Sequence, residues 1–357
     1  MAYTTIDDPT AFFQTVTYTG NGATGRSITL PSDTDMQPDW VWLKSRGEAE
    51  HHQLTDSVRG VNKQLYSHLD YAEATETDRI TAFNSDGFTI ENDDIVNKNT
   101  IEFVAWNWKA GTSFSNSAGA NSATIASTGS VNTDAGFSII SYTGNGNDDD
   151  TAKIAHGLGV ALNMIIVKCR NAAGGWQTSS TSLGFNNVLQ LNETNAQASG
   201  TYAFGRTGVA PTSTVFTVSA TSGGNHTNTN NNTYIAYCFA EKQGYSKFGS
   251  YTGNGNADGT FVYTGFKPAF VMVKLVSAAG EDWFICDNKR EGYNAENNRL
   301  LPNLNSAEST DSPIDIVSNG FKARTSGANV NAGEDYLYAA FAEEPLVASN
   351  FNVATAR

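Results

Sequence analysis

One pentapeptide, Tyr-Thr-Gly-Asn-Gly, occurs three times in this chain of 357 residues and strongly limits what the chain can fold into. The copies cover residues 18–22, 142–146 and 251–255. Consecutive copies lie roughly 100 residues or more apart, which is the length of a whole domain and far longer than a solenoid unit. The sequence therefore predicts one domain copied in tandem.

Two further landmarks follow each pentapeptide in the same order. An apolar run that ends in lysine comes first, and a second apolar run closes each unit. The lysine-ended runs cover residues 40–44, 164–168 and 270–274, and the closing runs cover residues 103–108, 234–239 and 336–341. Because all landmarks keep one order and nearly constant spacing, chance is a poor explanation, and we interpret the chain as a triplication.

The apolar stretches are short, rich in Val, Ile, Tyr, Phe and Trp, and bounded by Gly, Asn, Asp, Ser and Thr, which is typical of strands and turns. Helical periodicity over about 11 residues is nearly absent. We therefore expect an all-β chain of three tandem antiparallel β-sandwiches, of jelly-roll or lectin-like type. In each pentapeptide, Tyr and Thr should end a strand and Gly-Asn-Gly should form a turn, since glycine adopts positive φ without a Cβ clash.

Composition suggests where the domains begin and end. The predicted units are an N-terminal arm at residues 1–10, β-sandwich repeats at 11–110, 136–243 and 244–345, a Gly/Ser/Asn-rich linker at 111–135, and a C-terminal arm at 346–357. Because the linker is rich in small polar residues, we expect the first repeat to pivot, whereas the second and third abut and should form a rigid pair. The two arms are expected either to dock on a neighbour in an assembly or to fray.

The charge balance excludes several classes of partner. The formal net charge is −14, which argues against binding to duplex nucleic acid or to an anionic membrane. No apolar run of about 18 residues is present, and the N-terminus has neither the basic nor the apolar region of a signal peptide. Cys169, Cys238 and Cys286 each lie in an apolar run, which favours buried thiols in a protein made in reducing cytosol.

Several segments of the chain resemble a family of uncharacterised proteins of tailed bacteriophages, mostly marine phages. The segments that carry the resemblance are residues 1–9, 82–89, 104–110, 234–255 and 262–271. The resemblance spans nearly the whole chain and implies a protein of the virion exterior, made in the host cytoplasm and built from lectin-like or jelly-roll-like sandwiches. Leu162-Asn163 departs from the family pattern, where a turn containing proline is expected, and so does the C-terminal arm.

The same resemblance implies the partners of the chain. These are other virion proteins of the tail or capsid, further copies of the chain in a homo-oligomer, and a host surface glycan. The expected function is that of a non-enzymatic structural protein. The favoured placement is in the tail or a fibre, facing the host. The alternative is a decoration protein on the capsid exterior. A glycan depolymerase is a third hypothesis, since glycoside hydrolysis needs two carboxylates across a cleft. Carboxylates are so abundant in this chain, and so many lie in turns, that their presence gives this hypothesis little support.

No catalytic or cofactor motif is present, since the chain has neither a Gly-x-Ser-x-Gly elbow nor a His-Glu-x-x-His sequence. We therefore expect no catalytic residues and no cofactor. The pair His51-His52, with Glu48 and Glu50 nearby, is a candidate metal cluster. Adjacent residues of a strand point to opposite faces, so a solvated charged loop is the favoured interpretation.

Two weaker ligand hypotheses remain. Asp148, Asp149 and Asp150 follow the second pentapeptide and Asp258 follows the third, so they are candidate Ca²⁺ ligands, because hard cations take oxygen ligands. Solvated turn carboxylates are the favoured alternative. Three aromatic residues, Trp176, Trp283 and Tyr293, are candidates for stacking on a sugar ring. Trp176 and Trp283 recur at equivalent positions of their repeats, which favours a role in the core instead.

Overall fold

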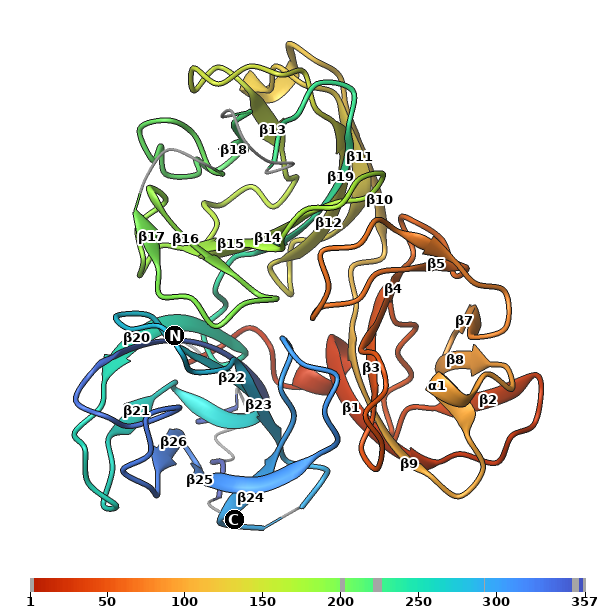
Figure 1. Ribbon diagram of the computed structural model, residues 1–357, viewed down its shortest axis with the longest axis vertical. Coiled ribbons are helices and arrows are strands. Elements are labelled where there is room, and N and C mark those ends of the chain that lie inside the picture. Colours follow the sequence, from red (N-terminus) through yellow and green to blue (C-terminus); the bar gives the residue numbers. More distant parts are fainter. Residues whose placement is uncertain (1–2, 200–202, 221–226, 292, 349–352, 356–357) are drawn as a thin grey trace.

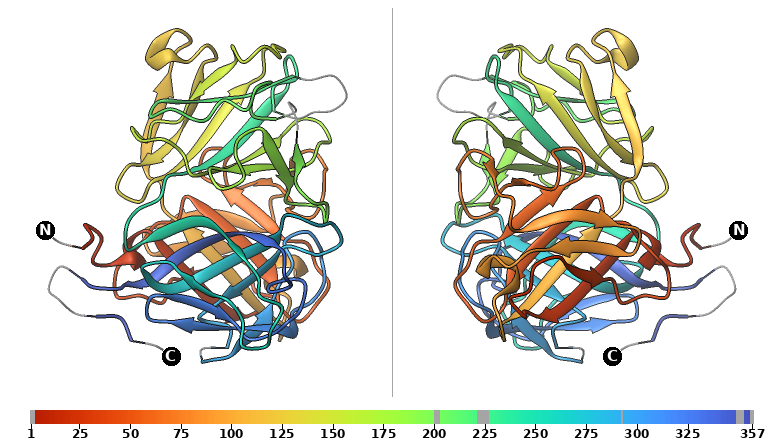
Figure 2. Two further views of the ribbon diagram at one scale, coloured as in Figure 1. Left: turned by 90° about the vertical axis from the view of Figure 1, so that its left-hand side faces the viewer. Right: turned by 90° about the vertical axis from the view of Figure 1, so that its right-hand side faces the viewer.

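The computed structural model describes residues 3–199, 203–220, 227–291, 293–348 and 353–355, and its regular structure is almost entirely antiparallel β-strand (Figure 1). The predicted all-β sandwich class is confirmed. The helical segments of the described residues are short: η1 (Pro9–Ala11), α1 (Asp94–Asn97) and η2 (Ala120–Ser122). The three repeats surround a common centre, with repeat 2 stacked above repeats 1 and 3 in the side views (Figure 2).

Each repeat contributes four strands that keep one antiparallel order. The strand that carries the pentapeptide pairs with the closing run, the closing run pairs with the lysine-ended run, and that run pairs with the next strand. In repeat 1 the order is β1 (Phe13–Thr19), β9 (Glu102–Trp108), β3 (Trp40–Ser45) and β4 (Gln53–Asp56). In repeat 2 it is β12 (Phe137–Thr143), β19 (Thr233–Phe239), β14 (Met164–Cys169) and β15 (Gln177–Ser180). In repeat 3 it is β20 (Ser246–Thr252), β27 (Asp335–Pro345), β22 (Phe266–Leu275) and β23 (Phe284–Asp287).

A second, smaller sheet covers one face of each four-strand unit. It consists of β2 (Arg26–Thr29), β8 (Gly87–Ile90) and β7 (Ile80–Asn84) in repeat 1, and of β13 (Lys153–Ala155) and β18 (Val215–Thr217) in repeat 2. In repeat 3 it consists of β21 (Phe261–Tyr263), β26 (Gly320–Ala323), β25 (Ser309–Val317) and β24 (Glu296–Arg299). One further pair, β5 (Lys63–Gln64) and β6 (Ala74–Thr75), lies between repeats 1 and 2 (Figure 1).

The lysine-ended runs are apolar throughout because their strands are buried on both faces. Successive side chains of a strand point to opposite sides. In β3, Val41 and Leu43 pack against the small sheet of repeat 1, whereas Trp40 and Trp42 face a core that all three repeats share. The same division recurs in β14 and β22.

The shared core is dominated by aromatic side chains and lies where the three repeats meet. The Trp40 ring stacks on Tyr237 of repeat 2 with 4.3 Å between ring centroids. Trp108 and Phe239 contact Phe341 of repeat 3 at centroid distances of 5.6 and 5.9 Å. A repeat taken alone would expose its aromatic face to water. In the chain these faces pack against one another, so the three sandwiches form one packed body.

The segment at residues 111–135 is not a flexible linker, so that prediction, and the pivoting first repeat that followed from it, are wrong. It contains β10 (Thr112–Asn116) and β11 (Ser127–Asn132), which extend the sheet of repeat 2 at the β12 side. Two more strands, β16 (Asn187–Gln190) and β17 (Ala198–Ser199), extend the sheet at its other side. Edge strands expose much of their surface and can be rich in Ser and Thr, so their composition resembles that of a linker.

The N-terminal arm docks within the chain. The Tyr3 hydroxyl donates to the carbonyl oxygen of Gly265 at 2.6 Å, and the Thr4 hydroxyl donates to that of Gln243 at 2.7 Å. Gly265 belongs to repeat 3, and Gln243 immediately precedes that repeat. The arm therefore ties the start of repeat 1 to repeat 3.

In every repeat the Tyr and Thr of the pentapeptide end a strand, as predicted, and Gly-Asn-Gly leaves that strand. Each of the two glycines has a separate steric reason. A Cβ on the first glycine would overlap a backbone carbonyl oxygen in every repeat, at Lys98 for Gly20, Thr229 for Gly144 and Ala332 for Gly253. The second glycine has positive φ in every repeat: 67° at Gly22, 79° at Gly146 and 69° at Gly255. The hydroxyl of the motif tyrosine donates to the backbone oxygen of Val96, Thr227 or Val330.

Replacing Gly253 with alanine is expected to lower the free energy of unfolding by about 1–3 kcal/mol, because the backbone must shift to admit the Cβ. Gly333 is the matched control, since a Cβ there would meet no atom within 4 Å. Alanine at position 333 should change stability by less than about 0.5 kcal/mol. Urea denaturation measures both variants, and equal costs would contradict the close-approach explanation.

Candidate functional site

The structure places Trp176 and Trp283, two of the three sugar-contact candidates, in the interior, so the sugar contact is wrong for both and the favoured core role is confirmed. Their side chains are 0% and 1% exposed. The Trp176 indole N–H donates to the Tyr66 carbonyl oxygen of repeat 1 at 2.9 Å. The Trp283 indole N–H donates to the Gln190 carbonyl oxygen of repeat 2 at 3.0 Å. The two tryptophans recur because they join neighbouring repeats.

In repeat 1, His52 occupies the position equivalent to Trp176 and Trp283. The prediction that His52 lies in a solvated loop is wrong. It is fully buried, and its Nε2 lies 3.0 Å from the Leu301 carbonyl oxygen of repeat 3. The Trp42 indole N–H donates to its Nδ1 at 2.9 Å, which assigns the proton to Nε2. With the two tryptophans, His52 closes the repeats into a ring, because repeat 2 bonds to 1, repeat 3 to 2, and repeat 1 to 3.

Buried ion pairs reinforce two of these junctions. Arg59 Nε donates to Asp56 Oδ2, and Arg290 Nε donates to Asp287 Oδ2 at 2.6 Å. All four side chains are fully buried. The neighbouring repeat donates a further bond to each carboxylate: one from the Tyr237 hydroxyl to Asp56, and one from the Trp106 indole to Asp287.

The lysines that end the apolar runs are buried and donate to backbone carbonyl oxygens. Lys168 Nζ lies 2.8 Å from the Tyr71 oxygen of repeat 1, and Lys274 Nζ lies 3.4 Å from the Thr194 oxygen of repeat 2. Lys44 Nζ donates to the Glu48 oxygen of its own repeat at 2.9 Å. Burial lowers the pKa of each lysine to about 8. These lysines therefore hold loops in place near the junctions.

The candidate Ca²⁺ ligands are not brought together. Asp150 accepts bonds from the backbone N–H groups of Arg206 and Thr207, and Asp149 accepts from the Thr151 hydroxyl. Asp258 belongs to repeat 3 and pairs with Lys322. Asp148 is exposed beside Asp149. Within the described ranges, no group of three or more His, Cys, Asp or Glu side chains is placed to hold a metal ion.

Three histidines, His51, His68 and His156, lie in sites where burial disfavours the charged form of the ring and lowers its pKa. The His51 Nδ1 and His68 Nε2 atoms are 2.9 Å apart, and burial lowers the pKa of His68 to about 4. His156 is fully buried, its Nδ1 accepts from the Leu158 N–H, and burial lowers its pKa to about 4 as well. Each of these histidines is therefore neutral at pH 7.

Acidification is expected to destabilise the fold between pH 6.5 and about 4. The folded state holds His156 neutral in this range while the unfolded chain binds a proton, so the free energy of unfolding falls as the pH falls. From this residue alone, the loss between pH 7 and 4.5 should be about 2–3 kcal/mol. Urea denaturation at the two pH values measures it. His156→Gln, which cannot titrate, should reduce the dependence, and an unchanged dependence would contradict the assignment.

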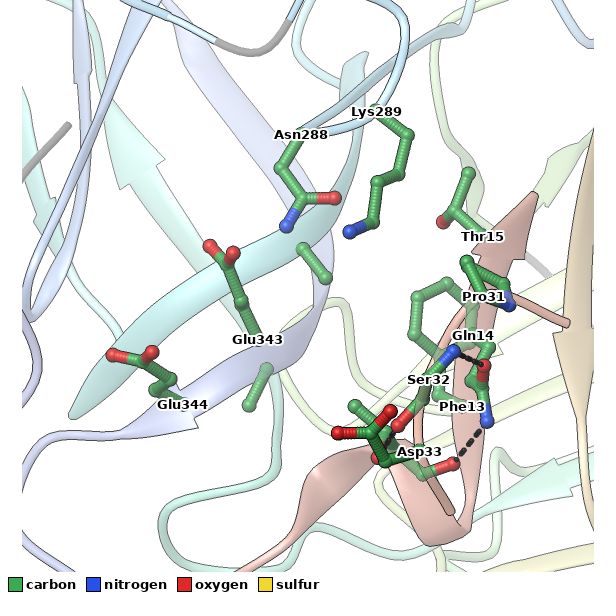
Figure 3. Close-up of a pocket in the computed structure, with 13 residues that line it drawn as sticks. Phe13, Gln14, Thr15, Pro31, Ser32, Asp33, Asn288, Lys289, Glu343 and Glu344 are labelled. Carbon is green, nitrogen blue, oxygen red and sulfur yellow. Dashed lines mark hydrogen bonds between the residues drawn. The ribbon is translucent and has the colours of Figure 1, made fainter. Parts of the chain in front are cut away.

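A cavity of about 330 Å³ opens between repeats 1 and 3, and we call it the junction cavity (Figure 3). Its buried floor includes Phe13 and Thr15 of β1 together with Ala269 and Asn288 of repeat 3. Its exposed rim carries charged side chains, among them Asp33, Lys289 and Glu344. The junction cavity thus combines an apolar floor with polar groups of several kinds.

Two floor atoms of the junction cavity lack hydrogen-bond partners. Thr15 Oγ1 and Asn288 Oδ1 are buried without a partner, and each residue is only 2% exposed. Buried polar groups are rarely left unpaired, because their desolvation is not compensated. These two atoms are therefore the clearest candidates for contact with a ligand, and sequence analysis missed both.

Comparison of the repeats explains why the cavity exists at this junction. Trp40, Met164 and Phe270 pair with the closing strand of their own repeats at corresponding positions. The residues immediately before them, Asp39, Asn163 and Ala269, are therefore equivalent. Asp39 accepts the Ala110 N–H at 2.9 Å, and Asn163 accepts the Glu241 N–H at 2.8 Å. Alanine at position 269 offers no such group and leaves space. An alignment of the three repeats would show this difference.

The fold and the junctions define an all-β protein whose three repeats close into one ring. A family model described as a domain of unknown function (DUF7483) matches residues 8–345, and the chain belongs to that family. No curated protein and no solved structure matches the chain. None of the helices in the described residues is long and apolar enough to cross a membrane.

Proposed function

We propose that this chain is a non-enzymatic structural protein on the exterior of a tailed-phage particle, where it forms part of the tail or fibre and faces the host. The observation that carries the proposal is the location of the buried charged side chains. Asp56, Arg59, Asp287 and Arg290 lie in the junctions between repeats, and none of them lines the junction cavity. The assignment to a tailed-phage particle rests on the resemblance to tailed-phage proteins.

Placement of the carboxylates also supports a non-enzymatic role. Glycoside hydrolysis needs one carboxyl group that burial keeps protonated and a second carboxylate opposite it. Asp33 and Glu344 at the rim of the junction cavity are exposed, and Glu343 pairs with Lys267 at 3.1 Å. Incubation of the protein with host polysaccharide should release no reducing ends, and release would establish a depolymerase instead.

The ring supports one alternative, a decoration protein on the capsid exterior. Three repeats in one strand order around a common centre give a single chain an approximate threefold arrangement (Figure 1). Such a body can sit where three copies of a partner meet, because each repeat faces one copy in a similar way.

Gel densitometry of purified particles separates the two placements. A tail or fibre component should be present in a few to a few dozen copies, whereas a capsid decoration protein should be present in hundreds. Labelling with an antibody against the chain should then mark the tail rather than the head. Absence of the chain from purified particles would overturn both placements.

A further inference from the structure

We propose that the junction cavity binds an uncharged saccharide ring. This inference deepens the proposed function, and it rests on that function only for the source of the sugar, a glycan on the host surface. The argument for the binding site itself depends on the cavity, its unpaired groups and its charge.

The cavity occurs where the third repeat departs from the other two. In repeats 1 and 2 an Asp39 or Asn163 side chain caps a backbone N–H at this position. In repeat 3 the equivalent residue is Ala269, which forms part of the cavity floor. The remaining volume of about 330 Å³ lies within the range of about 300–1,000 Å³ that is usual for small-molecule sites.

The hydrogen-bonding capacity of the two unpaired floor atoms matches that of hydroxyl groups. Asn288 Oδ1 can only accept a hydrogen bond, whereas the Thr15 hydroxyl can donate and accept. Figure 3 shows both side chains beside the open space, with the Lys289 amine between them in this view. Neighbouring hydroxyls of a sugar can donate to Asn288 and bond to Thr15 at the same time.

The remaining walls fit the other properties of a sugar ring. Phe13, Ala269 and Ala342 supply an apolar floor on which the C–H face of a pyranose can lie. Asp33 and Glu344 at the rim disfavour an anion, and Lys289 disfavours a cation. An uncharged, polyhydroxylated ligand satisfies all of these groups.

A second cavity, of about 510 Å³, lies near Phe12 and Phe114 and provides a comparison. Among the described residues, none that lines it has a buried polar side-chain atom without a partner. Size alone therefore does not single out a site in this molecule. Unpaired atoms alone do not either, because the indole N–H groups of Trp40 and Trp108 are unpaired beside a third cavity, but that cavity has a volume of only about 20 Å³. The junction cavity combines unpaired polar atoms with a volume that can hold a sugar ring.

Saturation-transfer NMR on the full chain tests the proposal with four probes: the methyl glycosides of glucose, galactose, mannose and N-acetylglucosamine. At least one of them should receive saturation from the wild-type protein. Ala269→Asn places in repeat 3 the side chain that repeat 2 already has, so the variant should fold, and the added amide should narrow the cavity at its floor. We expect it to weaken binding at least tenfold. Inorganic phosphate, the anionic probe, should not bind.

Two more variants keep the test decisive. Thr15→Val removes the unpaired hydroxyl at nearly constant volume, so it should weaken glycoside binding without lowering the melting temperature. Tyr71→Ala is the matched control, because Tyr71 is 60% exposed and lies outside the cavity. It should leave binding unchanged.

Three results would overturn the proposal: no transfer to any glycoside, undiminished transfer in both cavity variants, or loss of transfer in Tyr71→Ala alone. Binding of phosphate without any glycoside would also overturn it. None of these results would change the copy number on purified particles, so failure of the sugar site is distinguishable from failure of the structural role.

Discussion

Replacing Arg290 with alanine is expected to lower the free energy of unfolding by about 3–5 kcal/mol, because it leaves a buried carboxylate without its cation. Arg290 Nε donates to Asp287 at 2.6 Å, and a second guanidinium nitrogen donates to the Ile285 carbonyl oxygen at 2.7 Å. Both charged side chains are fully buried at the junction of repeats 3 and 1. Water therefore cannot replace the lost partner.

An exposed ion pair provides the control for this measurement. Lys247 Nζ lies 2.7 Å from Glu241, but the two side chains are 36% and 29% exposed. Lys247→Ala should therefore cost less than about 1 kcal/mol. Urea denaturation compares the variants, and a cost for Arg290→Ala no larger than that for Lys247→Ala would contradict the role of the junction ion pairs.

The shared core adds an expectation about cooperativity. Because Trp40, Tyr237 and Phe341 belong to different repeats but to one aromatic core, loss of one junction should expose the surfaces of the other two repeats. The wild-type chain should therefore unfold in a single transition. A separate early transition for one repeat would show that the sandwiches are energetically independent.

The fold class could be predicted because strands leave a local signal. The lysine-ended runs are short and continuously apolar, and in the structure each is a strand that is buried on both faces. The strand end in each pentapeptide could be predicted for the same reason, and the positive φ of the second glycine is likewise a local requirement. The requirement for the first glycine could not be read from the sequence, because it comes from a backbone oxygen many residues away.

Ring closure could not be predicted, because it depends on which repeat contacts which. Trp176 and Trp283 recur, but the third member of the set is His52, which breaks the pattern in residue type. The strands at residues 112–116 and 127–132, which extend the sheet of repeat 2, were hidden by their polar composition. The junction cavity depends on one alanine, Ala269, whose meaning appears only when the repeats are superimposed.

The second large effect concerns Trp176, where sequence alone allowed either a sugar contact or a core residue. Trp176→Ala should lower the free energy of unfolding by about 3–5 kcal/mol, because it empties a buried site at the junction of repeats 1 and 2. Trp176→Phe, which keeps an aromatic ring but removes the N–H donor to Tyr66, should cost about 1–3 kcal/mol.

Tyr293→Ala separates the two interpretations. This side chain is 65% exposed, so its removal should change stability by less than about 0.5 kcal/mol. Urea denaturation measures all three variants under one set of conditions. If Trp176→Ala were as stable as Tyr293→Ala, the indole would not be joining the repeats, and the ring would have to be held by its ion pairs and aromatic core alone.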